Sequence, residues 1–164
     1  MIMKGTYFLL GINFLFFIIF NIILGSFVCG DIPWRMFCIK SEYLFQFAQV
    51  NQLIFEGKNL YQLITKMFVH IAILHFLLNM FSLWFFATRL EKISSSTFLV
   101  VVFLLSGFST SITNLLLGTI ISAGASGAIF GIATVFTILN WNEKNTKLFF
   151  IAFLIFIHSP ALLG

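Results

Sequence analysis

The uncharged stretch from Ile93 to Asn142, ISSSTFLVVVFLLSGFSTSITNLLLGTIISAGASGAIFGIATVFTILNWN, decides the fold class of this chain. A helix that spans a bilayer needs roughly 20 apolar residues, with a range of about 17–25. The stretch is therefore long enough for two spanning helices. Glycines and small polar residues interrupt its apolar pattern between Gly118 and Gly124, which predicts a turn there.

Three further uncharged runs cover residues 5–30, 67–88 and 148–164. The chain is 60% hydrophobic and only 9% charged, whereas soluble domains carry about 25% charged residues. Backbone groups in lipid must be satisfied within a helix or a closed barrel. The runs are continuous and lack the alternation of barrel strands, which favours helices. We therefore predict one all-α membrane domain over residues 1–164, a polytopic bundle with five spanning helices.

The basic residues at the ends of these runs predict how the protein lies in the membrane. Short loops rich in Lys and Arg stay on the cytoplasmic side. Such residues precede the first span and separate the second from the third and the fourth from the fifth: Lys4, Arg89, Lys92, Lys144 and Lys147. The turn at 118–124 has none. We expect a cytoplasmic amino terminus, with residues 31–66 and 118–124 outside, and no nucleic-acid partner despite the net charge of +4.

The first span and the segment after it each allow two interpretations. The first run is too long for a signal-peptide core of about 7–15 residues, so we expect a retained helix. Segment 31–66 is either an amphipathic piece in the membrane interface or an ordinary packed loop. Cys29 and Cys38 would lie outside, where a disulfide is chemically possible. We expect two free, partly buried thiols.

The second span carries a stripe of polar residues. At about 100° per residue, His75, Asn79 and Ser82 share one face of a helix. His70 would lie about 140° away from His75 on such a helix. A span that enters at residue 67 would place His75 roughly 12 Å deep. We find no Asp or Glu within any predicted span, so we expect no metal site.

Ser126 lies near the start of the fourth span, where exposed backbone N–H groups can face a developing anion. Imidazole and amide donors such as His75 and Asn79 can stabilise the oxyanion that forms when a serine attacks a carbonyl. The alternative is that they only join neighbouring helices. Gly127 and Gly131 likewise suit either close helix packing or close approach of a substrate.

These motifs together resemble those of rhomboid intramembrane proteases. YQLITKMFVH (61–70), continued by IAILHFLLNMFSLWFFATRLEK, is similar to the second-helix signature of that family, and GASGAIFG (124–131) is similar to its Gly-x-Ser-Gly motif. The resemblance covers roughly residues 55–164. It implies that Ser126 is the nucleophile, that His75 and Asn79 line the oxyanion hole, and that His70, Gly124 and Gly127 support them.

The resemblance has two departures. Tyr61-Gln62 stands where the family often has Trp-Arg. More seriously, rhomboids have six helices, and the serine is paired with a histidine of the sixth, within an Ala-His-x-x-Gly type of motif. No such motif follows here; His158 precedes Ser159-Pro160 and is not expected to act as the base. A serine without a base is a weak nucleophile. We therefore expect a piece of a six-helix protease.

The resemblance implies a serine endopeptidase that cuts membrane-anchored proteins in or near their transmembrane segments, without a metal or cofactor. Its partners would be transmembrane substrates and the lipid bilayer. The compact form of the chain, without large appended domains, favours a bacterial host and its inner membrane. Two alternatives stay open. A catalytically dead relative would bind transmembrane clients, and part of a transporter would use its broken helices to bind a solute. The absence of carboxylates from the predicted spans argues against the transporter.

Overall fold

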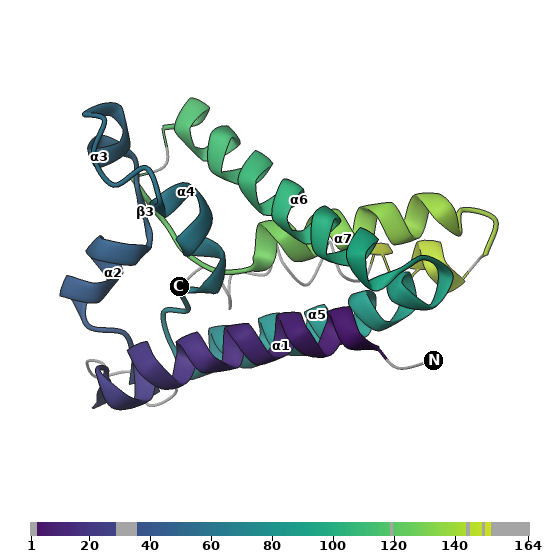
Figure 1. Ribbon diagram of the computed structural model, residues 1–164, viewed down its shortest axis with the longest axis horizontal. Coiled ribbons are helices and arrows are strands. Elements are labelled where there is room, and N and C mark those ends of the chain that lie inside the picture. Colours follow the sequence, from purple (N-terminus) through teal and green to yellow (C-terminus); the bar gives the residue numbers. More distant parts are fainter. Residues whose placement is uncertain (1–2, 29–35, 119, 144, 149, 152–164) are drawn as a thin grey trace.

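The computed structural model of the chain is a bundle of long helices (Figure 1). It describes residues 3–28, 36–118, 120–143, 145–148 and 150–151. Three of its helical segments are long and apolar enough to cross a membrane, and a shorter apolar helix follows them. In chain order these are α1 Lys4–Phe17 with its π-helical continuation η1 Ile18–Ile23, then α5 Ile73–Ile93, α6 Ser96–Leu116 and the shorter α7 Ser126–Leu139. The prediction of a polytopic helical bundle is confirmed.

The spans differ in detail from the predicted ones. The first leaves its helix after Ile23, not at residue 30, and the chain turns into a strand. The second begins as a helix only at Ile73 and continues to Ile93, past the end of the uncharged run. The turn predicted at 118–124 lies between α6 and α7 as expected. Of the fifth predicted span, 148–164, only residues 148, 150 and 151 are described.

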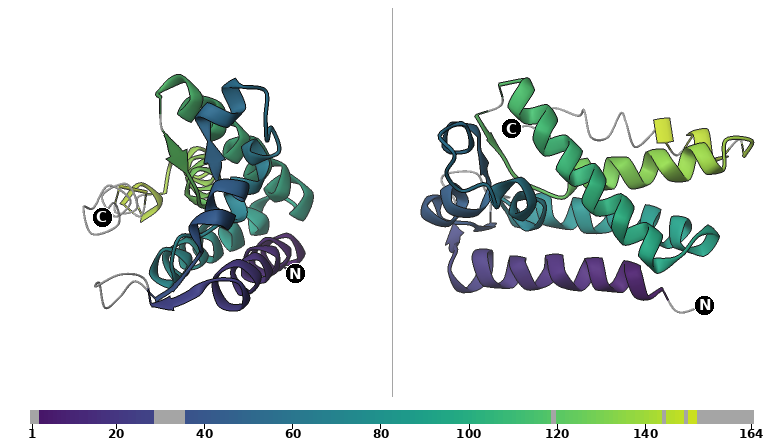
Figure 2. Two further views of the ribbon diagram at one scale, coloured as in Figure 1. Left: turned by 90° about the vertical axis from the view of Figure 1, so that its left-hand side faces the viewer. Right: turned by 45° about the horizontal axis from the view of Figure 1, so that its top comes forward.

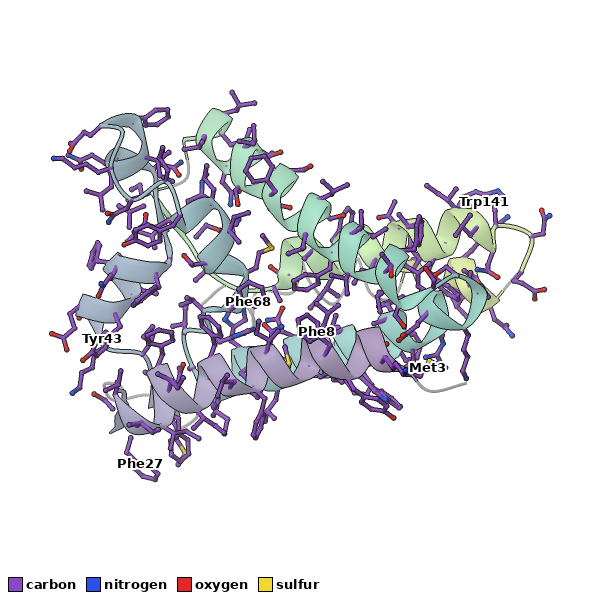
Figure 3. All side chains as sticks on the ribbon, in the orientation of Figure 1. Met3, Phe8, Phe27, Tyr43, Phe68 and Trp141 are labelled. Atoms are coloured by element: carbon purple, nitrogen blue, oxygen red, sulfur yellow. The ribbon has the colours of Figure 1, made fainter. Side chains whose placement is uncertain are left out.

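The long helices run back and forth between two ends of the molecule. Figure 1 shows α1 beside α5, with α6 running obliquely above this pair and crossing in front of α7. Figure 3 shows Met3 and Trp141 at one end, and Phe27 and Tyr43 at the other. The basic flanks of the helices thus collect near Met3, and the short elements collect at the opposite end. The carboxyl end of α6 and the start of β4 lie beside these short elements (Figure 2).

The interior of the bundle is apolar and closely packed. Leu83, Leu90, Phe103 and Ile132 are fully buried where α5, α6 and α7 meet. Many large apolar side chains point outward instead, including Phe8, Phe81 and Leu105. Outward apolar side chains are expected in lipid, where helices associate through packing rather than through the hydrophobic effect.

The described part of the segment between η1 and α5 consists of short elements that pack on one another and on the bundle. An antiparallel pair, β1 Ser26–Val28 with β2 Met36–Cys38, closes the end of α1. A second pair joins β3 Gln49–Val50 to β4 Ile121–Ser122. The short helices are α2 Ser41–Phe47, α3 Asn51–Phe55, α4 Gln62–Thr65 and the 3₁₀ turn η2 Lys66–Phe68.

Buried amide side chains hold this loop in place. Gln62 accepts a hydrogen bond from the Val50 N–H (3.0 Å) and donates to the carbonyls of Phe45 and Gln46. Gln49 donates to the carbonyl of Ser111 on α6 (2.9 Å). Because these bonds satisfy backbone groups that water would otherwise need to reach, the loop packs against the bundle as part of the fold.

Two predictions made from the sequence are wrong. Cys38 is disulfide-bonded in the structure and is not a free thiol; Cys29, the other cysteine of the chain, lies outside the described residues. The second error concerns carboxylates. Because α5 continues past residue 88, it contains Glu91, which is almost completely buried.

The Glu91 carboxylate joins three helices. It accepts hydrogen bonds from the backbone N–H groups of Gly5 (2.8 Å) and Thr6 (2.9 Å), from the Thr6 hydroxyl (2.6 Å) and from the Ser96 hydroxyl (2.5 Å). The first turn of α1 has backbone donors without intrahelical partners, and a negative charge there is favourable. The basic residues Arg89 and Lys92 had marked this region as the loop between two spans, so a buried role for Glu91 was not predicted from the sequence.

Candidate active site

Ser126 is the first residue of α7, and the backbone before it is bent sharply. Gly124 has φ +112°, a conformation that side chains with a Cβ rarely adopt. Its N–H donates to the carbonyl of Lys66 (2.9 Å), and Ala125 is fully buried. The turn therefore fixes the start of α7, while Ser126 itself is exposed among the described residues. The first backbone N–H groups of α7 have no partners within that helix and are exposed at the end of the helix where Ser126 lies.

His75 lies directly against this turn. A Cβ added to Gly124 would lie 2.7 Å from Cε1 and 2.9 Å from Nε2 of the His75 ring. The Ile71 N–H donates to His75 Nδ1 through a long bond of 3.5 Å. In a neutral imidazole one nitrogen donates and the other accepts. We therefore assign the proton to Nε2, so that the ring presents an N–H donor at Gly124, two residues before Ser126.

Asn79 follows one helical turn after His75 on the same face of α5. It is 6% exposed, and its Nδ2 donates to the His75 carbonyl (2.8 Å). An amide NH₂ group has two hydrogens, so this bond leaves one donor available. Ser82, the third residue of the predicted stripe, is also buried. The helical spacing of the stripe is thus as predicted, although His75 lies in the first turn of α5 rather than eight residues into a helix.

His70 does not follow the helical geometry that was predicted. It precedes α5 and is fully buried. Its ring centroid lies 5.4 Å from that of His75, and its edge meets the ring of Phe76 (centroids 5.2 Å apart, 87°). Within the described part of the chain, neither ring nitrogen of His70 has a hydrogen-bond partner. The two histidines are therefore neighbours, because the chain turns between them.

The glycines of α7 allow it to pack closely on α6. A Cβ on Gly127 would overlap the side chain of Thr110, and one on Gly131 would overlap the Ser106 hydroxyl. These neighbours are the small residues that α6 presents to α7. Of the two interpretations of the glycines, close helix packing is the one that these contacts support.

Lys66 also contacts the turn before Ser126, a role that was not predicted from the sequence. It is 3% exposed. Its carbonyl accepts from the Gly124 N–H (2.9 Å), and its Nζ donates to the Ser122 hydroxyl (3.4 Å). Burial lowers the pKa of Lys66 to about 8. In the sequence Lys66 is only the last charged residue before the uncharged run 67–88, so no pattern predicted its contacts with the turn.

No group of three or more His, Cys, Asp or Glu side chains among the described residues is placed to hold a metal ion. His158, the remaining histidine considered as a base, lies outside the described residues. The polar groups that the structure shows beside the turn before Ser126 include the His75 imidazole, against Gly124, and Lys66, whose Nζ donates to the Ser122 hydroxyl.

Comparison with known proteins places this chain. Residues 57–163 match the model of the rhomboid domain. RHOMBOID-like protein 6, mitochondrial, of Arabidopsis thaliana is 36% identical over 97 residues, covering 57% of this chain and 32% of that protein. Rhomboid protease GluP of Bacillus subtilis is 37% identical over 84 residues (51% and 16%). RHOMBOID-like protein 2 of Arabidopsis thaliana is 41% identical over 73 residues (44% and 23%).

The chain spans about a third or less of the length of each of these curated relatives. The match itself covers well over half of the chain and contains both the His75–Asn79 stripe and the turn at Ser126. Together with apolar helices long enough to cross a bilayer, it identifies an integral membrane protein. The chain belongs to the rhomboid family.

Proposed function

We propose that this chain carries the nucleophile and the oxyanion donors of an intramembrane serine endopeptidase. The observation that carries the proposal is the contact of His75 with Gly124, two residues before Ser126. In the proposed reaction, the Ser126 hydroxyl attacks the carbonyl of a peptide bond. The negative charge that forms on the carbonyl oxygen is stabilised by His75 Nε2–H, by the Asn79 amide and by N–H groups of the first turn of α7.

The proposed roles divide the work between two helices. The first turn of α7 and the first turn of α5 meet at the end of the bundle that holds the short elements. His75 with its proton on Nε2 is a donor and therefore does not serve as the base. The family resemblance assigns that role to a histidine of a sixth helix.

The proposed substrates are membrane-anchored proteins, cut in or near their transmembrane segments. Exposed apolar side chains on α5, such as Leu77 and Phe81, offer a surface compatible with another apolar helix. We further propose that the amino terminus is cytoplasmic, in a bacterial inner membrane. Two features support this orientation. Lys4, Arg89 and Lys92 lie at the ends of helices that meet near Met3. The disulfide-bonded Cys38 belongs to β2, which pairs with the strand of Phe27 at the other end.

A fluorophosphonate probe tests the nucleophile directly, because it reacts with activated serines without a substrate. Ser126→Ala in the full-length protein is expected to abolish both labelling and cleavage of a membrane-anchored substrate. Ser109→Ala is the matched control, because Ser109 is an exposed serine on α6. Cleavage that persists in Ser126→Ala contradicts the proposal.

A second candidate function is a catalytically inactive relative that binds transmembrane clients. It is favoured by one observation: among the described residues no hydrogen bond involves the Ser126 hydroxyl, so none of them activates it. Absence of labelling in the folded full-length protein, together with retained capture of transmembrane proteins by both wild type and Ser126→Ala, would favour this second function.

A further inference from the structure

Asn21 is a buried polar residue in the first span, far in sequence from the residues of the proposed site. It lies in η1, where the α-helix of the span loosens into a π-helix. It is 1% exposed. Single π-helical turns within α-helices are frequent at functional sites, and polar groups within membrane helices are costly unless they have partners. Hydrophobic packing therefore does not explain why an asparagine is buried at position 21.

The Asn21 amide joins three parts of the chain. Its Nδ2 donates to the carbonyl of Phe37 in β2 (2.9 Å) and to the carbonyl of His70 before α5 (2.8 Å). Both hydrogens of the NH₂ group are thus used. The side chain links the first span to the hairpin that follows it and to the segment that leads into the second span.

The segment that Asn21 holds is the one that orients His75. Ile71 follows His70 directly, and its N–H donates to His75 Nδ1 (3.5 Å). The carbonyl of Ile71 accepts from the Ile39 N–H (3.2 Å). The peptide units of His70 and Ile71 are therefore fixed from the side of the hairpin and from the side of the first span. Their fixed position directs the Ile71 N–H toward the imidazole.

The same helix supplies an internal comparison. Asn13 is also fully buried, but its Nδ2 donates to the carbonyl of Leu9 within its own helix (2.8 Å). In both residues the side-chain oxygen has no partner within the described residues. The two asparagines thus share burial and an unsatisfied acceptor, and differ in that only Asn21 reaches the segment beside His75.

We propose that Asn21 is a positioning residue for His75: by holding the His70 carbonyl it keeps the Ile71 N–H on Nδ1 and so keeps the His75 proton on Nε2. The inference rests on the proposed function in one respect, that an Nε2–H donor at Gly124 serves catalysis. The positional part concerns the tautomer of His75, which is measurable whether or not the protein cleaves anything.

The test compares Asn21→Leu with Asn13→Leu in the full-length protein. Asn21→Leu is expected to lower kcat roughly ten- to a hundredfold, since a donor in an oxyanion site contributes about 10²–10³ and here it is disordered rather than removed. KM is expected to stay within about twofold, because Asn21 does not touch the proposed substrate surface. Asn13→Leu is expected to keep kcat within about threefold of wild type.

The second readout is the ¹⁵N spectrum of the imidazole, recorded with labelled histidine in the Ser126→Ala background. His75 is expected to be an Nε2–H tautomer with Asn21 present and in Asn13→Leu, and to show a mixed tautomer population in Asn21→Leu. Should Asn21→Leu fail to fold, Asn21→Ser, whose hydroxyl can donate to only one carbonyl, is measured in the same way and is expected to give a smaller shift in the same direction.

The outcomes separate the two proposals. An unchanged His75 tautomer in Asn21→Leu, or equal losses of kcat in Asn21→Leu and Asn13→Leu, overturns the positioning role. A tautomer that changes in Asn21→Leu, in a protein whose cleavage survives Ser126→Ala, upholds the positioning role and rejects the proposed protease chemistry.

Discussion

Replacing Gly124 by alanine changes the proposed site in two ways that can be measured separately. The first is backbone strain, because Gly124 has φ +112°, and a Cβ in such a conformation costs roughly 1–2 kcal/mol. The second is a direct collision with His75. The added Cβ would lie 2.7 Å from Cε1 and 2.9 Å from Nε2, where ordinary van der Waals contact begins at 3.4 Å.

The collision determines the expected loss of activity. The His75 ring must retreat by about 0.7 Å to restore ordinary contact, and a misplacement on the order of 1 Å can lower a rate about 10²-fold. Loss of one oxyanion donor has a similar effect, on the order of 10²–10³. We therefore expect Gly124→Ala to lower kcat and the rate of fluorophosphonate labelling roughly 10²-fold, which corresponds to about 2.7 kcal/mol.

Gly118→Ala is the matched control. Gly118 has φ +71°, so an alanine there is strained in a similar manner, but no atom lies within 4 Å of the added Cβ. Both variants are expected to lose stability in thermal unfolding from backbone strain, with a further loss in Gly124→Ala from the collision with His75, while only Gly124→Ala loses activity. If Gly124→Ala labels and cleaves within about threefold of Gly118→Ala, the inference that His75 must lie against this turn is refuted.

Two further predictions concern the stability of the fold. Glu91→Gln replaces a carboxylate that accepts four hydrogen bonds and is expected to lower the free energy of unfolding by about 2–4 kcal/mol, seen as a lower Tm in detergent; an unchanged Tm contradicts this role. The pKa of Lys66 is lowered to about 8 from the ordinary 10.5. Between about pH 8 and pH 10.5 the folded chain therefore binds fewer protons than the unfolded chain, so the stability of the wild type should rise with pH across that window. Lys66→Met should raise stability by about 1–2 kcal/mol at pH 7, and the gain should vanish near about pH 10; a gain independent of pH would show that the amine is not responsible.

The sequence predicted those features that depend on composition and on helical spacing. Continuous apolar runs require helices in lipid, so the spans were identified without any tertiary information. The four-residue spacing of His75 and Asn79 requires a common face wherever a helix contains both. Glycines at both ends of the interruption predicted the turn before Ser126, since no other residue adopts its backbone conformation as readily.

The features that were missed depend on side chains meeting across long sequence distances. Residues 62–68 form α4 and η2, and α5 starts only at Ile73, so His70 lies outside the helix that the spacing argument assumed. The bonds of Asn21 join residues 16 and 49 positions apart. Glu91 lies between Arg89 and Lys92, which marked the end of the second predicted span, and two of its partners, Gly5 and Thr6, lie about 85 positions away. No local pattern encodes such pairs.

The hydrogen bonds of Glu91 with Gly5, Thr6 and Ser96 also limit where the protein can be truncated. The stretch recognisable as rhomboid starts at residue 57, yet the donors that neutralise the Glu91 carboxylate include the backbone of residues 5 and 6. A truncation at the edge of recognisable similarity would leave a carboxylate in the bundle with one hydroxyl partner instead of four bonds. A version of the protein that keeps the Glu91 contacts therefore includes residues 5 and 6, upstream of the family match.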